Sequence, residues 1–282
     1  MNNVSNYDFE VIIVENGSFD QSYRKLLTIN KADGRFKILR LSRNFGCDGA
    51  ISAGLQYAKG EAAILMNADL QDPPEVIPEF IKKWEEGYEI VYGEIQKREG
   101  VPLTRRISSA IFYEIINRLT GGLFPKNASD FRLIDKKVYQ TANKLPERNR
   151  FLRGIIAWTG FSQTGVPFSR PRRFAGKAKA SFGDVLRVAL NGIYAFSYFP
   201  LKVVTALGII LSTVSFIAIV IYIILFLVYG RQVPGFTTLL TFMLFLFGML
   251  FFILGIIGEY LSRIYDEVKQ RPYFIVKEEI GL

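Results

Sequence analysis

Two long apolar segments in the last third of the chain restrict its fold more than any other feature. Residues 203–228 and 237–258 contain no Asp, Glu, Lys or Arg, and the short segment between them, "YGRQVPGF", holds glycine and proline. As a helix, the first segment is roughly 39 Å long, which exceeds the roughly 30 Å hydrocarbon core of a bilayer. A buried helix pair in a soluble protein is the alternative, but two such segments joined by a tight turn favour a transmembrane hairpin.

Basic residues lie mainly outside this hairpin. The turn holds only Arg231, and the flanking basic residues are Arg187, Lys202, Arg263, Lys269 and Arg271. Because positively charged loops stay on the cytoplasmic side, both termini are expected in the cytoplasm. The formal net charge of +9 predicts an anionic partner, and in a chain with these segments we expect lipid and phosphate rather than nucleic acid.

Amphipathic segments precede the hairpin. Residues 181–201 carry apolar and aromatic residues on a helical period, which favours a helix in the membrane interface over an ordinary core helix. The segment "RRISSAIFYEIINRLTGG" has the same character, and both locations stay open for it. The expected organisation is a globular domain at 1–180, an interfacial helix at 181–201, the hairpin at 202–258 and a cytoplasmic tail at 259–282.

The globular part alternates strand-like and helix-like segments. The expected strands are "FEVIIVENG", "FKILRLS", "EAAILMNAD" and "YEIVYGE", with amphipathic segments between them. This alternation predicts parallel strands joined by right-handed helical crossovers in one α/β sheet. Ligands of such sheets bind beyond the carboxyl ends of the strands. The segments "ENGS" and "NADLQD" are therefore expected to border one crevice.

Acidic side chains follow the third expected strand, in "MNADLQDPPE". Magnesium usually takes one or two carboxylates, completed by phosphate and water oxygens. We therefore expect Asp69 to bind a metal, with Asn67 as a neutral neighbour. Asp72 precedes Pro73, so capping of the following helix is its expected role.

The chain has no histidine and one cysteine, Cys47, which excludes a Ser-His-Asp triad, a histidine-ligated zinc and an intrachain disulfide. Proton transfer must then use Asp, Glu, Lys or Tyr. In "NASDFRLIDKK", Asp130 is either a surface acid paired with Arg132 or a general base. The basic segment "RPRRFAGKAKAS" either attracts anionic headgroups or holds phosphate oxygens.

Several motifs together resemble a known family. The segments "LSRNFGCDGAISAGLQYAKGEAAILMNADLQDPPE", "ASDFRLID" and "RRFAGKAKAS", followed by the hairpin, resemble the polyprenyl-phosphate glycosyltransferases of glycosyltransferase family 2. That group includes the bactoprenol glucosyltransferases and the dolichol-phosphate mannose synthases. The resemblance implies a GT-A fold and an inverting transfer of a hexose from a nucleotide sugar, UDP-glucose by default, to undecaprenyl phosphate. The reaction would take place at the cytoplasmic face of a bacterial plasma membrane, in a homo-oligomer such as a tetramer, and serve a cell-surface glycan.

The same resemblance implies roles for particular residues. Mg²⁺ or Mn²⁺ would be bound at Asn67 and Asp69, and the catalytic acids would be Asp130, as candidate base, and Asp72. The implied donor-binding residues are Glu15, Asn16, Arg43, Asn67 and Asp69. The implied phosphate- and acceptor-binding residues are Arg132, Arg173, Lys177 and Lys179.

The chain departs from the family pattern on the nucleotide side. A first strand and its Pro-x-Tyr-Asn-Glu turn are missing before "FEVIIVENGS", Glu15 and Asn16 replace two aspartates, and Asn67 replaces the first aspartate of the metal motif. These departures favour an alternative, a catalytically impaired relative that acts as a membrane-bound binding or assembly subunit. A processive polysaccharide synthase is disfavoured, because its Gln-x-x-Arg-Trp motif is absent and two spans form no evident channel.

Overall fold

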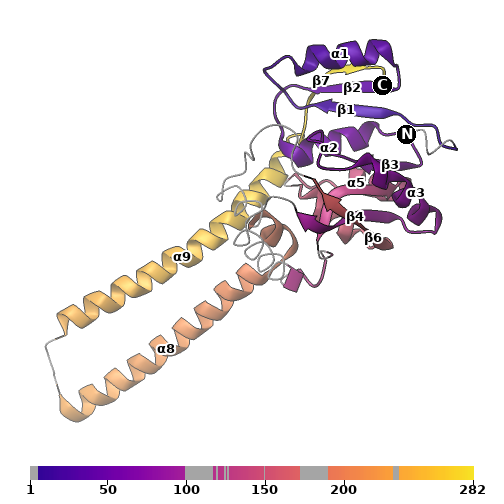
Figure 1. Cartoon of the computed structure of the whole chain (residues 1–282). Helices are drawn as coiled ribbons and strands as arrows, with labels where there is room; N and C mark the ends of the chain where they lie inside the picture. The colour runs from indigo at the N-terminus through magenta and orange to yellow at the C-terminus, as the bar shows by residue number, and fades with distance from the viewer. Residues whose placement is uncertain are drawn as a thin grey trace. The chain divides into compact units, whose positions relative to one another are not determined.

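A computed structural model of the chain shows two compact units, Met1–Ala195 with Gln270–Leu282, and Phe196–Lys269 (Figure 1). The residues that the structure describes are 6–98, 117–118, 120–123, 125, 127–148, 150–171, 190–230 and 235–282. Most of the "RRISSAIFYEIINRLTGG" segment and residues 181–189 of the expected interfacial helix lie outside these ranges.

The first unit contains two sheets. In the smaller one, β1 (Val11–Glu15) and β2 (Phe36–Leu41) are parallel and joined by α1 (Ser22–Ala32). The C-terminal strand β7 (Val276–Ile280) pairs antiparallel with the other edge of β2, so the order is β1-β2-β7. A segment expected as a plain tail thus completes a sheet of the first unit.

The larger sheet has the order β3-β5-β4-β6. Its strands are β3 (Ala62–Leu65), β4 (Ile90–Arg98), β5 (Ala128–Asp135) and β6 (Gln163–Arg170). The central strand β5 runs antiparallel to both β3 and β4, whereas β6 is parallel to β4. The predicted α/β class is confirmed, but the expectation of a single parallel sheet is wrong.

The two sheets are separate because β1 and β3, at their edges, do not pair with each other. Within the described residues, no strand pairs with the second edge of either of them. Their apolar side chains, in "VIIV" and "AAIL", are only half-buried, although such runs are typical of strands covered on both faces. The α2 helix (Gly46–Tyr57) spans the two sheets: its Ala53 packs with Leu39 and Leu41 of β2, and its Leu55 packs under the larger sheet.

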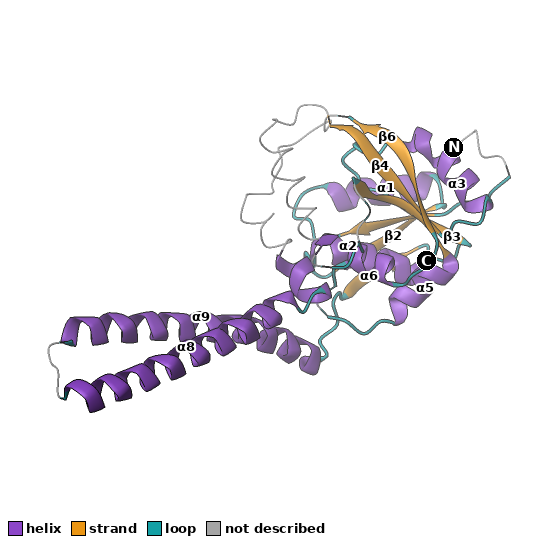
Figure 2. Ribbon diagram, turned by 90° about the horizontal axis from the view of Figure 1, so that it is seen from below, coloured by secondary structure: helices purple, strands orange, loops and turns teal. Residues whose placement is uncertain are grey.

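Helices cover both faces of the larger sheet (Figure 2). On one face, Phe80 of α3 (Ile77–Glu85) packs with Phe131 and Phe168. The short helix η1 (Pro74–Val76) directly precedes α3 in the chain. On the other face lie α2, α5 (Lys136–Lys144) and α6 (Leu152–Trp158). Because neighbouring residues of a strand point to opposite faces, Leu133 belongs to the first layer and Ile134 to the second.

The second unit holds α8 (Phe199–Tyr229) and α9 (Phe236–Lys269). Both are long and apolar enough to cross a membrane, with mean hydropathies of 2.8 and 2.7 over segments that are not buried within the protein. The α9 helix continues beyond the uncharged segment through "EYLSRIYDEVK", where Arg263 pairs with Glu259 at 2.8 Å. At the start of α8, the Ser197 hydroxyl accepts a hydrogen bond from the Phe199 N–H.

Candidate functional site

The loop after β3 is organised by Asp72. Asp72 is 2% exposed, and its Oδ2 accepts hydrogen bonds from the Asn67 backbone N–H at 3.0 Å and from the Asn67 side-chain amide at 3.2 Å. The loop reverses through Leu70, which has a φ of 58°, so Asp72 faces the start of its own loop. The expected helix cap is therefore wrong: Pro73 occupies the cap position of η1, and no side chain caps that helix.

The same loop is fastened to the end of β6. The Gln71 side chain donates to the Pro171 carbonyl at 3.0 Å, and the Arg170 Nη2 lies 3.4 Å from the Asp72 Oδ1. Burial raises the pKa of Asp72, and although Asn67 and Arg170 oppose this shift, the pKa stays above its ordinary value. Asp69, half-buried, accepts a hydrogen bond from the Gln71 N–H at 3.2 Å.

The loop supplies only part of the coordination shell of a divalent cation, so phosphate and water oxygens would have to supply the rest. The Asn67 amide nitrogen points at Asp72. The Asn67 amide oxygen and the Asp69 carboxylate are therefore the groups of this loop that remain to bind a metal ion. No group of three or more acidic or cysteine side chains gathers as a metal cage among the described residues. One carboxylate and one amide oxygen still suit Mg²⁺, which takes most of its shell from phosphate and water.

A second acidic centre lies on β5. Arg153, from the start of α6, donates two hydrogen bonds to the Asp130 carboxylate: Nε lies 2.9 Å from Oδ1 and Nη2 lies 2.6 Å from Oδ2. Arg132 is farther away, with its Nη2 at 3.9 Å from Oδ1. Burial raises the pKa of Asp130, but Arg153, with help from Arg132 and Arg170, outweighs it, so the pKa falls below its ordinary value.

Arg132 is almost completely buried, at 4% exposure, and its Nη2 donates to the Ser129 carbonyl at 2.8 Å. Burial lowers its pKa to about 10, so the guanidinium remains charged at neutral pH. Arg132 and Arg153 line one small cavity of about 10 Å³ together with Tyr92, and that volume suits about one water molecule. The two guanidinium groups thus converge beside Asp130.

The first turn of α2 adds a third acid that the sequence did not single out. The Asp48 carboxylate lies close to the Leu152 backbone N–H at the start of α6, and it faces Asp130, Arg150 and Arg153. Burial and the charge of Asp130 raise the pKa of Asp48 to about 6. Four acids, Asp48, Asp69, Asp72 and Asp130, therefore lie close to Arg132, Arg153 and Arg170. These seven residues form one charged cluster.

Of the expected donor-binding residues, Glu15, Asn16 and Arg43 lie at the ends of β1 and β2 on the smaller sheet, whereas Asn67 and Asp69 follow β3 of the larger sheet. Glu15 is 3% exposed, and its carboxylate accepts the Ser18 N–H and pairs with Arg40 at 3.2 Å. The Asn16 amide donates to Asn44 Oδ1 at 3.2 Å and to the Gly46 carbonyl at 2.9 Å. Both side chains hold their loops together in this structure.

Arg43 lies on the exposed surface of the second loop, with its guanidinium 4.1 Å from the centre of the Phe45 ring. Gly17 packs against the Arg43 backbone so closely that a Cβ on it would lie 2.4 Å from the Arg43 carbonyl carbon. Its φ of 69° also favours glycine, so the two loops approach through this position. The three expected acceptor residues Arg173, Lys177 and Lys179 lie outside the described residues.

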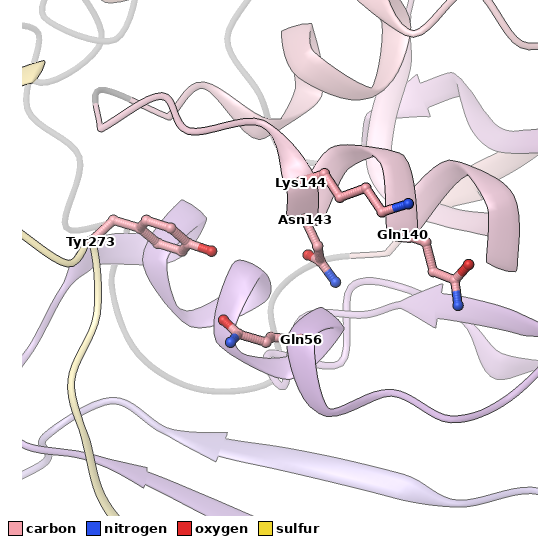
Figure 3. Close-up of a pocket in the computed structure, with 5 residues that line it drawn as sticks. All are labelled: Gln56, Gln140, Asn143, Lys144 and Tyr273. Carbon is pink, nitrogen blue, oxygen red and sulfur yellow. The ribbon is translucent and has the colours of Figure 1, made fainter. Parts of the chain in front are cut away.

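A larger pocket is lined by a different set of residues (Figure 3). It has a volume of about 620 Å³ and is lined by Gln56, Gln140, Asn143, Lys144 and Tyr273, none of which the sequence analysis singled out. The Asn143 amide is committed to the Leu55 carbonyl at 3.0 Å. The charged cluster, rather than this polar pocket, holds the residues suited to phosphate chemistry.

Comparisons with known proteins agree with the motifs. The family described as glycosyl transferase family 2 matches residues 1–142. The chain is 44% identical over 274 residues to an uncharacterized glycosyltransferase of Synechocystis, covering 97% of this chain and 86% of that protein. It is 41% identical over 275 residues to an uncharacterized glycosyltransferase of Bacillus subtilis, covering 98% and 85%. It is also 37% identical over 272 residues to a prophage-derived bactoprenol glucosyl transferase of Shigella flexneri, covering 96% and 88%. The chain belongs to glycosyltransferase family 2.

Proposed function

We propose that this protein is a membrane-bound inverting glycosyltransferase that moves a hexose from a nucleotide sugar to undecaprenyl phosphate. The observation that carries the proposal is the charged cluster, in which Asp69 and Asp72 lie in the loop after β3 and Asp130 and Arg132 lie on the neighbouring strand β5. Arg170 lies 3.4 Å from Asp72 and also lowers the pKa of Asp130, so it links the two groups. UDP-glucose is the proposed donor, in keeping with the glucosyl transferase relatives.

The reaction would be one displacement. An oxygen of the lipid phosphate attacks the anomeric carbon, the bond from that carbon to the diphosphate oxygen breaks, and the configuration inverts. Because the attacking phosphate is already anionic, orientation and charge shielding matter more than proton removal. Asp130, with its lowered pKa, suits the role of an ionised orienting group better than that of a proton acceptor. Arg132 and Arg153 supply positive charge beside it.

Asp69 and Asn67 are the proposed ligands of a divalent cation, Mg²⁺ or Mn²⁺. When bound, such a cation would neutralise charge on the diphosphate of the donor. Asp72 contributes by orienting the Asn67 amide, since its Oδ2 accepts from the Asn67 Nδ2 at 3.2 Å. Its raised pKa reflects a buried carboxylate close to Asp69.

The membrane would supply the acceptor. We place α8 and α9 across a bacterial plasma membrane as a hairpin, with the catalytic unit and both termini in the cytoplasm. The basic segment with Arg173, Lys177 and Lys179 would then meet the acceptor phosphate. A homo-oligomer such as a tetramer belongs to the same proposal.

A second function is favoured by one set of observations. Asn67 contributes no charge to the expected metal site, Glu15 is bound within its own loop, and β1 and β3 each have an edge without a partner strand among the described residues. A catalytically impaired relative, acting as a membrane-bound binding or assembly subunit, would retain the acceptor side and lose the donor side.

The test is transfer of radiolabelled sugar from UDP-glucose, and in parallel from UDP-N-acetylglucosamine, to undecaprenyl phosphate in membranes that contain this protein. The variant Asp69→Ala removes the only carboxylate proposed for the cation, and Glu86→Gln on the exposed end of α3 is the matched control. Metal-dependent product that is lost in Asp69→Ala and kept in Glu86→Gln supports the enzyme. Absence of product with both sugars, from protein shown to be folded, supports the impaired relative.

A further inference from the structure

Asp130 has one dominant partner, and it is not its neighbour in the "SDFRLID" motif. Arg153 holds both carboxylate oxygens, at 2.9 Å and 2.6 Å, whereas Arg132 lies 3.9 Å away. Such a two-point contact fixes the plane of the carboxylate as well as its position. The Asp130 side chain still keeps 40% of its surface exposed, so a bound ligand can reach it.

The other end of this contact is fixed as well. Arg153 belongs to the first turn of α6, and the Asp48 carboxylate of α2 lies close to the backbone N–H of the preceding Leu152. The following residues of α6, including Ile155 and Ile156, are buried in the core. The start of α6 is thus held against the core, and its arginine projects toward Asp130 of β5.

We propose that Arg153 is a positioning residue, which sets the orientation and the charge of Asp130 for glycosyl transfer. The proposal rests on the function proposed above and adds a residue from α6 to it. A lysine at this position would keep the positive charge but lose the two-point contact, because an ammonium is a point charge. A glutamine would lose both.

The charge of Asp130 depends on several neighbouring groups, and the experiment must account for all of them. Among the described residues, the titratable and charged groups that face it are Arg132 on β5, Arg153 on α6, Arg170 on β6, and Cys47 and Asp48 on α2. Arg153 is the strongest of the three basic ones. Its removal should therefore move the protonation of Asp130 toward neutral pH, while the other two arginines keep part of the shift.

The experiment compares Arg153→Lys, Arg153→Gln and Lys137→Gln, a change on the exposed surface of α5, in the transfer assay across pH. Arg153→Lys should lower kcat by about 100-fold with little change in KM for the nucleotide sugar, as expected for a misplaced group. In Arg153→Gln the acidic limb of the pH profile should also move up by about one pH unit. The Lys137→Gln variant should match the parent.

A second readout does not need activity. In protein labelled with ¹³C at aspartate side chains, the Asp130 carboxyl signal, assigned with Asp130→Asn, should titrate at higher pH in Arg153→Gln than in the parent. An unchanged titration, or an Arg153→Gln enzyme with parental kcat and an unmoved acidic limb, overturns the proposal. If the parent transfers no sugar, the proposed function fails, and the titration alone still decides whether Arg153 sets the charge of Asp130.

Discussion

The Asp72 carboxylate binds Asn67 twice, through the backbone N–H at 3.0 Å and the side-chain amide at 3.2 Å. A change of Asn67→Asp would place a second carboxylate against this buried one, where the amide now donates. We predict that Asn67→Asp lowers the free energy of unfolding by about 1–2 kcal/mol at neutral pH without metal. Thermal unfolding in detergent measures the loss, and added Mg²⁺ should reduce it.

The matched control is Asn67→Ala, which removes the side-chain hydrogen bond without adding charge. At acidic pH the Asn67→Asp variant should recover, because protonation of either carboxyl restores a hydrogen bond between them. If the metal-free Asn67→Asp protein is as stable as the parent at neutral pH, the Asn67 amide does not donate to Asp72 as described.

Arg170 offers a second test of the same buried acid. Asp72 is 2% exposed and its pKa is raised, so the fold disfavours its ionised form, and stability declines as pH rises through that pKa. Arg170, 3.4 Å away, limits this cost. We predict that Arg170→Gln destabilises the protein by about 1–2 kcal/mol at neutral pH and by little at acidic pH, where Asp72 is protonated.

The control for this prediction is Arg35→Gln, which breaks an exposed pair with Asp33 at 2.6 Å. Such a surface pair contributes about 0–1 kcal/mol, so its loss should be small at every pH. Equal destabilisation by Arg170→Gln at neutral and acidic pH would contradict the assignment of the effect to Asp72.

The sequence predicted the class of fold well, because its periodicity is local information. Apolar runs placed β1 to β4 and both long helices, and the chemistry of "NADLQD" pointed to a loop at a strand end. The position of β5 was not predictable in the same way. Its antiparallel insertion between β3 and β4 depends on how distant segments pair, and the pattern of one strand does not encode its neighbours.

The residues of the candidate site were likewise predictable only in part from the sequence. Asp69 and Asp72 stood out because they follow an apolar run, and Asp130 because the family resemblance implied it as the candidate base. Asp48 and Arg153 did not, since each is a single charged residue at the start of a helix, where charge is common. Arg170 was expected only as part of the basic segment "RPRRFAGKAKAS", as a group for headgroups or phosphate, and not as the partner of Asp72. Only the fold brings Arg153 to Asp130, across 23 residues, and Arg170 to Asp72, across 98.

Asp48 provides a prediction of opposite sign. Its pKa of about 6 lies above the ordinary 3.8, so the folded state disfavours its charge at neutral pH. Replacement by asparagine removes that charge and keeps a polar side chain of the same size. We predict that Asp48→Asn stabilises the protein by about 1–2 kcal/mol above pH 6 and has no effect below about pH 4. Thermal midpoints across pH measure this, and a neutral-pH loss of stability would contradict it.

The C-terminal strand gives the last prediction. Val276 of β7 packs with Leu39 and Leu41 of β2, and the Ser42 N–H donates to the Ile275 carbonyl at 2.9 Å. A charge at the half-buried Val276 should undock β7, because placing an unpaired carboxylate against an apolar cluster is energetically unfavourable. We predict that Val276→Asp speeds hydrogen exchange of the Ser42 amide by about 10-fold or more, while exchange in β5 stays unchanged. The neighbouring Lys277→Asp, on the exposed face, should leave both rates as they are; equal exchange at Ser42 in the two variants would show that the tail does not protect β2.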